Sequence, residues 1–309
     1  MIAINGEPFT PGRFPDGTAL LRLEPGEGPV LIEWYYEGEA EMALLWYLVS
    51  HLREGGAVRT ISLYLPYVPN ARMDRVKARD EVFTLKYFAR FLNSLAFDTV
   101  TVRDAHSPVS LALIDRVVQE DIGPGVRALA ARLLPKGGLV FFPDEGASKR
   151  YGGLLVDPVA SPGSAAQAAA PAGAALMLAF GIKKRDWRTG RIDGLDVHGE
   201  VPGAPFDALI IDDICSYGGT FLHSARKLKE LGAGRIFLYI THCEHAILEG
   251  DLLTEEHGGR PLIERVYTTK SIFLKEHPRV EILDGAGVPD TLPADAPSLA
   301  RQDTPHTEA

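Results

Sequence analysis

The residues with the clearest chemical potential lie in the segment DALIIDDICSYGGTFLHSARKLKELGAG, which spans residues 207–234. An apolar run there ends in two adjacent acids, Asp212 and Asp213. The loop that follows contains Ser216, Tyr217, Gly218, Gly219 and Thr220. Adjacent carboxylates bind a sugar diol or a divalent cation, and the N–H groups of a glycine-rich loop at a helix N-terminus bind phosphate. The segment therefore predicts a sugar site and a phosphate site side by side.

The elements around this segment alternate between strand-like and helix-like patterns. Apolar spacing predicts helices over residues 39–54, 81–95 and 221–231, and short apolar runs predict strands over residues 61–65, 99–102, 139–142, 208–211 and 235–241. Such alternation is typical of α/β proteins whose strands are mostly parallel. In such folds ligands bind beyond the carboxyl ends of the strands.

His106 is a second candidate site residue. It follows the strand predicted over 99–102, while Ser107 is a good helix N-cap and Pro108 suits the first helical position. His106 is thus expected at a junction between a strand end and a helix start, which is where ligands bind in open α/β sheets. The alternative interpretation is a histidine with a purely structural role there.

Composition limits the function further. The chain has 309 residues, which suggests two domains, and its formal net charge of −9 argues against a nucleic-acid-binding surface. Its two cysteines are too few for a disulfide framework, so we expect a reducing, cytoplasmic location. The long uncharged stretch over residues 158–182 contains three prolines, so a membrane-spanning helix is not expected there.

The loop at 212–220 resembles the phosphoribosyl-pyrophosphate (PRPP) binding loop of phosphoribosyltransferases (PRTases) and ribose-phosphate pyrophosphokinases, also called PRPP synthetases. Three more segments resemble the second family: the stretch over residues 63–117, which includes NARMDR and DAHS; VFFPDEGASKR; and MLAFGIKKRD. The resemblance extends over residues 30–284 and is greatest to the variant described from bacteriophages.

The resemblance implies an α/β fold with two PRTase-like domains, each a mostly parallel sheet flanked by helices. We expect an N-terminal domain on the ATP side over residues 1–137, a C-terminal domain with the PRPP loop over 138–284, and a disordered tail over 285–309. The implied reaction transfers the β,γ-diphosphoryl group of ATP to the C1 hydroxyl of ribose 5-phosphate, with Mg²⁺ as cofactor, and yields PRPP and AMP. The family also implies a homodimer or a larger homo-oligomer.

Carried over residue by residue, the resemblance assigns roles to individual side chains. His106 and Asp144 match metal-binding positions, and His106 also contacts the ATP phosphates. Lys183 and Arg185 match the catalytic pair that stabilises the transferred diphosphate, with Lys184 as an alternative to Lys183. For ATP the candidates are Arg72, Trp34 and Glu37, and for ribose 5-phosphate they are Asp212, Asp213, Ser216, Tyr217, Gly218, Gly219 and Thr220.

Two other functions stay open on the sequence. Many phosphoribosyltransferases carry an Asp that acts on the incoming base where this chain has Ser216, which disfavours base transfer. A non-catalytic subunit that binds sugar phosphates or nucleotides is the other alternative. The cluster His242-Cys243-Glu244-His245 does not indicate a zinc site, because neighbouring side chains of a strand point to opposite faces.

Overall fold

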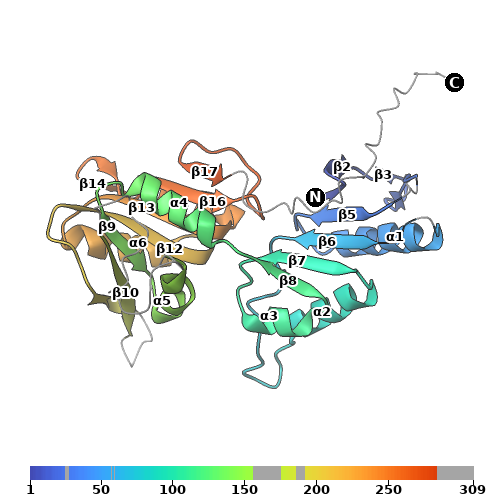
Figure 1. Ribbon diagram of the computed structural model, residues 1–309, viewed down its shortest axis with the longest axis horizontal. Helices are drawn as coiled ribbons and strands as arrows, with labels where there is room; N and C mark the ends of the chain where they lie inside the picture. Colours follow the sequence, from blue (N-terminus) through green and yellow to red (C-terminus); the bar gives the residue numbers. More distant parts are fainter. Residues whose placement is uncertain (25–27, 57, 59, 156–174, 186–191, 284–309) are drawn as a thin grey trace. The chain divides into compact units, whose positions relative to one another are not determined.

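The computed structural model describes residues 1–24, 28–56, 58, 60–155, 175–185 and 192–283 (Figure 1). The chain forms two compact units that divide between Gln119 and Glu120. This division lies earlier than the boundary expected after residue 137. The helix α4 (Gly123–Leu133) explains the difference, because it buries Val126 and Leu129 in the core of the second unit.

The first unit, residues 1–119, contains a six-stranded sheet in the order β2-β1-β5-β6-β7-β8. Its strands are β1 (Ile2–Ile4), β2 (Glu7–Phe9), β5 (Val30–Trp34), β6 (Ile61–Leu65), β7 (Thr99–Arg103) and β8 (Val117–Glu120), and a small separate hairpin pairs β3 (Gly12–Arg13) with β4 (Ala19–Leu20). The central strands β5, β6 and β7 run parallel, whereas β1 runs antiparallel to β2 and β5.

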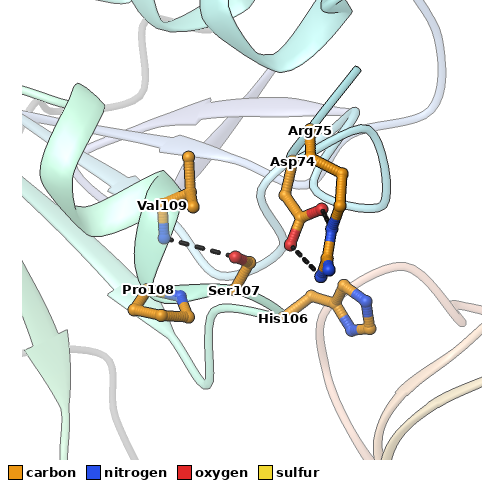
Figure 2. A pocket seen from close by; sticks show the side chains of 6 residues that line it. All are labelled: Asp74, Arg75, His106, Ser107, Pro108 and Val109. Carbon is orange, nitrogen blue, oxygen red and sulfur yellow. Dashed lines mark hydrogen bonds and ion pairs between the residues drawn. The ribbon is translucent and has the colours of Figure 1, made fainter. Parts of the chain in front are cut away.

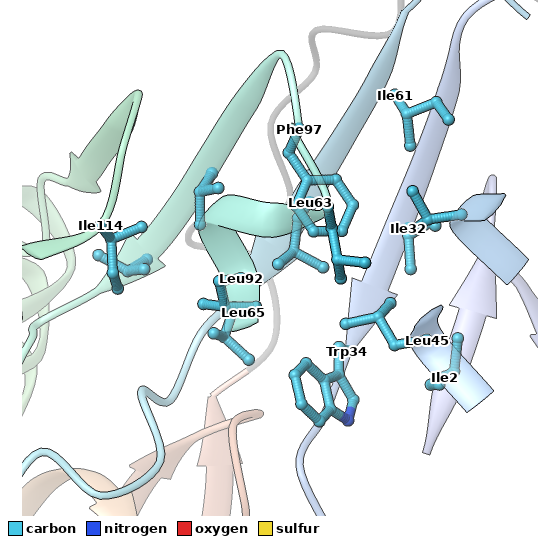
Figure 3. Close-up of a cluster of buried hydrophobic side chains, with 14 of the residues drawn as sticks. Ile2, Ile32, Trp34, Leu45, Ile61, Leu63, Leu65, Leu92, Phe97 and Ile114 are labelled. Atoms are coloured by element: carbon cyan, nitrogen blue, oxygen red, sulfur yellow. The ribbon is translucent and has the colours of Figure 1, made fainter. Parts of the chain in front are cut away.

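The described residues of this unit also form the helices α1 (Glu41–Glu54), α2 (Thr84–Ser94) and α3 (Pro108–Leu113). The helices bury leucines such as Leu45 and Leu92 against Ile32 and Leu63 of the sheet, as Figure 3 shows. The helical spacing of the apolar residues thus directs one face of each long helix into a single core. Ser107 caps α3 as expected, since its Oγ accepts a hydrogen bond from the N–H of Val109.

The second unit contains a seven-stranded sheet in the order β11-β10-β9-β12-β13-β16-β17. Its strands are β9 (Gly138–Phe142), β10 (Leu176–Arg185), β11 (Ile192–Gly199), β12 (Phe206–Cys215), β13 (Ala233–Cys243), β16 (Arg265–Thr269) and β17 (Val280–Leu283), and β14 (Glu256–His257) pairs with β15 (Arg260–Pro261) separately. All neighbours in the large sheet are parallel except β10 and β11.

Helices cover both faces of this second sheet. The helices are α4, α5 (Glu145–Tyr151) and α6 (Gly219–Glu230), with 3₁₀ turns η1 (Gly152–Leu155), η2 (His245–Glu249) and η3 (Asp251–Leu253). Alternate residues of β12 enter two different cores: Ile210 packs with α6, and Ile211 with α4 and α5. Burial on both faces explains why its central strands are continuous apolar runs.

The expected α/β architecture with two mostly parallel sheets is confirmed. The segment 285–309, which we expected to be a disordered tail, lies outside the described residues. Among the residues that the structure describes, no helix combines the length and the apolar character that crossing a membrane requires.

Candidate active site

The loop predicted to bind phosphate joins β12 to α6 in the second unit. Gly218 is the N-cap of α6 and adopts a left-handed conformation with φ of +87°, which favours glycine. The Tyr217 side chain is 59% exposed, so its bulk does not fill the loop. The first N–H groups of α6 follow directly at Gly219 and Thr220, which suits the loop to an anionic group.

The two acids before the loop have different environments. The carboxylate of Asp213 is buried and accepts a hydrogen bond from Nη1 of Arg150 at 2.7 Å. Asp212 lies half-buried beside it, and its Oδ1 accepts a hydrogen bond from the N–H of Asp213 at 3.0 Å. Partial removal from water and the negative charges of Asp213 and Asp144 raise the pKa of Asp212 well above its usual value. Asp212 is therefore the acid that a cation or a hydroxyl donor would stabilise most.

Asp144 approaches Asp212 from the neighbouring strand. It follows β9, which pairs in parallel with β12, so Asp144 lies just beyond the carboxyl end of β9 and Asp212 lies near the carboxyl end of β12. Asp144 is exposed and caps α5, where its Oδ1 accepts the N–H of Ala147 at 2.9 Å. The cap fixes this carboxylate at the same edge as Asp212.

These two acids fit a hard divalent cation. Mg²⁺ is commonly held by one or two carboxylates together with substrate phosphates and water, and a cation would relieve the repulsion between Asp144 and Asp212. Within the described ranges, no cluster of three or more His, Cys, Asp or Glu side chains is arranged to hold a metal.

Lys183 and Arg185 belong to the end of β10, next to β9 in the sheet. The backbone of this end pairs with β11, with Lys183 opposite Leu195 and Arg185 opposite Ile192. Parallel strands place these residues at the same edge as Asp144 and Asp212. The side chains of Lys183, Lys184 and Arg185 lie outside what the structure describes.

His106 lines a cavity of ≈ 510 Å³ in the first unit, shown in Figure 2. The other lining residues are Asp74, Arg75, Ser107, Pro108 and Val109. His106 is exposed at the junction between β7 and α3, as predicted. A hydrogen bond from Arg75, together with Ser107 and the nearby His106, holds the pKa of Asp74 below its usual value. The cavity therefore combines the Arg75 guanidinium and the His106 imidazole with the carboxylate of Asp74.

The three candidates for ATP differ in exposure. Arg72 is exposed just before Asp74, and Glu37 is exposed with its carboxylate 2.7 Å from the N-terminal amine. Trp34 is fully buried in the core, where its indole N–H donates to Glu41 and its ring packs against Phe88. The expectation that Trp34 contacts the nucleotide is corrected by this burial, because a ring covered by its own unit is unavailable to a ligand.

Three contacts at these sites were absent from the sequence-based prediction. Asp74 hydrogen-bonds Arg75 beside His106, Arg150 binds Asp213, and Ser216 donates its hydroxyl proton to Glu244. Asp74 lies within the NARMDR segment, Arg150 ends VFFPDEGASKR, and Glu244 belongs to the cluster that ends β13. These three partners could have been sought among the charged residues that lie within a site motif or at a strand end.

Comparisons with known proteins show which proteins this chain is similar to. The chain is 30% identical over 239 residues to the ribose-phosphate pyrophosphokinase of Pyrococcus furiosus, a match that covers 74% of this chain and 76% of the relative. The Vibrio cholerae enzyme of the same name is 29% identical, with 74% of this chain and 66% of the relative covered. No protein-family model matches.

A solved structure agrees as well. The phosphoribosylpyrophosphate synthetase of Mycobacterium smegmatis superposes with a TM-score of 0.63 at 18% identity, and the match covers 89% of this chain and 85% of that one. At this identity the likeness supports the fold, while the sequence relatives carry the assignment. The chain belongs to the ribose-phosphate pyrophosphokinase family, whose members are diphosphate-transferring enzymes.

Proposed function

We propose that the protein transfers the β,γ-diphosphoryl group of Mg-ATP to the C1 hydroxyl of ribose 5-phosphate and so forms PRPP and AMP. The observation that carries the proposal is the β12-loop-α6 arrangement, in which the acids at 212–213 lie directly before a glycine-containing loop and a helix N-terminus. This order would suit a ribose bound next to its own 5-phosphate.

In the second unit, the N–H groups of residues 216–220 would bind the 5-phosphate, and Asp212 would accept hydroxyls of the ribose. Arg150 neutralises Asp213 and limits the negative charge that an incoming phosphate meets. Bound Mg²⁺, held by Asp144 and Asp212, would supply charge neutralisation to the diphosphate. The C1 oxygen attacks the β-phosphorus as its hydroxyl proton passes to water, the bond from that phosphorus to the α,β-bridging oxygen breaks, and AMP leaves with that oxygen.

In the first unit, His106 and Arg72 would contact the phosphates of ATP, with Glu37 as a candidate near the adenine. Lys183 and Arg185 would stabilise the negative charge on the diphosphate during transfer, which needs positioning and charge neutralisation more than covalent help. We place Trp34 in a structural role because it is buried.

The test is an assay of AMP release and PRPP formation by the purified chain with Mg-ATP, with and without ribose 5-phosphate. AMP that depends on the sugar phosphate, formed together with PRPP, supports the proposal. Lys183→Ala should lower turnover at least about a hundredfold, since oxyanion-type stabilisation has that magnitude. Lys227→Ala is the matched control and should keep wild-type turnover, because the Lys227 ammonium pairs with Glu230 within α6.

Lys184→Ala distinguishes the two neighbouring lysines, since only one of the two substitutions should abolish turnover. Wild-type rates in both variants contradict the role of this strand end. Binding of ribose 5-phosphate without any AMP release, repeated with other nucleotide donors, would instead indicate a non-catalytic binding subunit.

A further inference from the structure

The loop 216–220 rests on the segment that follows β13, residues 244–252, which we call the supporting segment. The N–H of Glu244 donates to the carbonyl oxygen of Cys215 at 2.8 Å, directly before the loop. A Cβ atom on Gly250 would lie 2.1 Å from the carbonyl oxygen of Tyr217, and one on Gly218 would lie 2.7 Å from Cβ of Leu252. The two backbones are therefore as close as glycine allows, and the supporting segment fixes the path of the loop.

The first residue of the loop is joined to the first residue of the supporting segment by their side chains. The hydroxyl of Ser216 donates a hydrogen bond to the carboxylate of Glu244. Both side chains are half-buried, so water competes less for this bond than it would at an open surface. A serine hydroxyl carries one proton. While that proton points to Glu244, Ser216 offers a ligand its backbone N–H rather than its O–H.

We propose that Glu244 is a positioning residue of the ribose 5-phosphate site. Its carboxylate holds the Ser216 hydroxyl, and this bond together with the contact at Cys215 aims the N–H groups of the loop at the 5-phosphate. The inference rests on the proposed function, since it assumes that this loop takes the sugar phosphate. What the site requires from residue 244 is a hydrogen-bond acceptor, because a negative charge alone would repel a phosphate dianion.

The test compares Glu244→Ala, Glu244→Gln and Ser216→Ala in the full chain. AMP release is measured with ribose 5-phosphate varied at saturating Mg-ATP and then with ATP varied. The dissociation constant of ribose 5-phosphate is measured in parallel by calorimetry. Glu249→Ala is the matched control, because Glu249 is exposed in the same supporting segment.

Glu244→Ala should raise the KM and the dissociation constant for ribose 5-phosphate about tenfold, as expected for loss of one intramolecular hydrogen bond. The KM for ATP and kcat should stay within about twofold, since the reacting groups are untouched. Glu244→Gln should restore the wild-type value, because its side-chain carbonyl accepts the same hydrogen bond. The double variant Glu244→Ala/Ser216→Ala should lose no more affinity for ribose 5-phosphate than the more impaired single variant, because the two substitutions remove the same hydrogen bond.

Wild-type affinity for ribose 5-phosphate in Glu244→Ala would overturn the inference. It would also be overturned if Glu244→Gln were as impaired as Glu244→Ala, or if the KM values for both substrates rose equally, because either result assigns Glu244 a charge or a general structural role. A wild-type chain that binds ribose 5-phosphate without releasing AMP would refute the proposed reaction alone, and the dissociation constants of the variants would then decide the role of Glu244. A wild-type chain that neither binds ribose 5-phosphate nor releases AMP would refute both the proposed reaction and the role of Glu244.

Discussion

Substitution by alanine at two adjacent glycines of the loop 216–220 should have opposite effects on the free energy of unfolding. Gly218 has φ of +87°, and a Cβ there would lie 2.7 Å from Cβ and 2.8 Å from Cδ2 of Leu252. Gly219 is the first residue of α6 and is exposed, and a Cβ there would meet no heavy atom within 4 Å. Gly218→Ala and Gly219→Ala therefore form a matched pair in one loop.

The expected cost of Gly218→Ala follows from two contributions. A non-glycine residue in the left-handed region costs about 1–2 kcal/mol, and forcing a methyl group into a packed site costs about 1–3 kcal/mol. Their sum predicts a loss of about 2–5 kcal/mol in the free energy of unfolding. Gly219→Ala adds a better helix former without a clash, so it should stabilise by up to about 1 kcal/mol.

The assay is equilibrium urea unfolding of the full chain followed by far-UV circular dichroism. Leu63→Ala, a cavity in the core of the first unit, identifies the transition of that unit. Gly218→Ala should shift the transition of the second unit to lower urea, and Gly219→Ala should leave it unchanged or raise it. Equal shifts for both glycines, or a neutral Gly218→Ala, would refute the argument that Leu252 and the backbone conformation determine this position.

Three further predictions concern titratable groups of the second unit. The pKa of Asp212 is raised in the folded state, so the contribution of this carboxyl group to stability is fully present below its unfolded pKa and is lost as pH rises through its folded pKa. Asp212→Asn removes the charge and should therefore raise the melting temperature of the protein at pH 8, and raise it less near pH 4. Burial acts to raise the pKa of Asp207, but the ion pair with Arg235 holds this pKa below its usual value, so Asp207→Asn should lower the melting temperature at pH 8. A change in melting temperature of the same sign for Asp212→Asn and Asp207→Asn would contradict this reasoning. Cys215 and Cys243 are buried side by side on β12 and β13, and a side-chain hydrogen bond between the two thiols together with burial raises the pKa of Cys215. Both thiols should be inert to an aromatic disulfide reagent in the native protein and react on unfolding, whereas rapid native reaction would show that this strand pair opens.

The sequence by itself determined the local elements that carry the site. The apolar run before Asp212 predicted β12, the glycines after it predicted the turn into α6, and Ser107 with Pro108 predicted the start of α3. These features are readable because they depend on residues close together in the chain, whose conformational preferences act locally.

Only the tertiary structure decided which distant residues meet. The pairing of β12 with β9 and β13 brings Asp144 beside Asp212, Arg150 onto Asp213, and Glu244 onto Ser216. Trp34 illustrates the same limit, because the family resemblance assigned it to ATP while the packing of α1 and α2 placed it in the core. Partners of this kind follow from strand order and from which sheet face a helix covers, and neither is encoded in a short window of sequence.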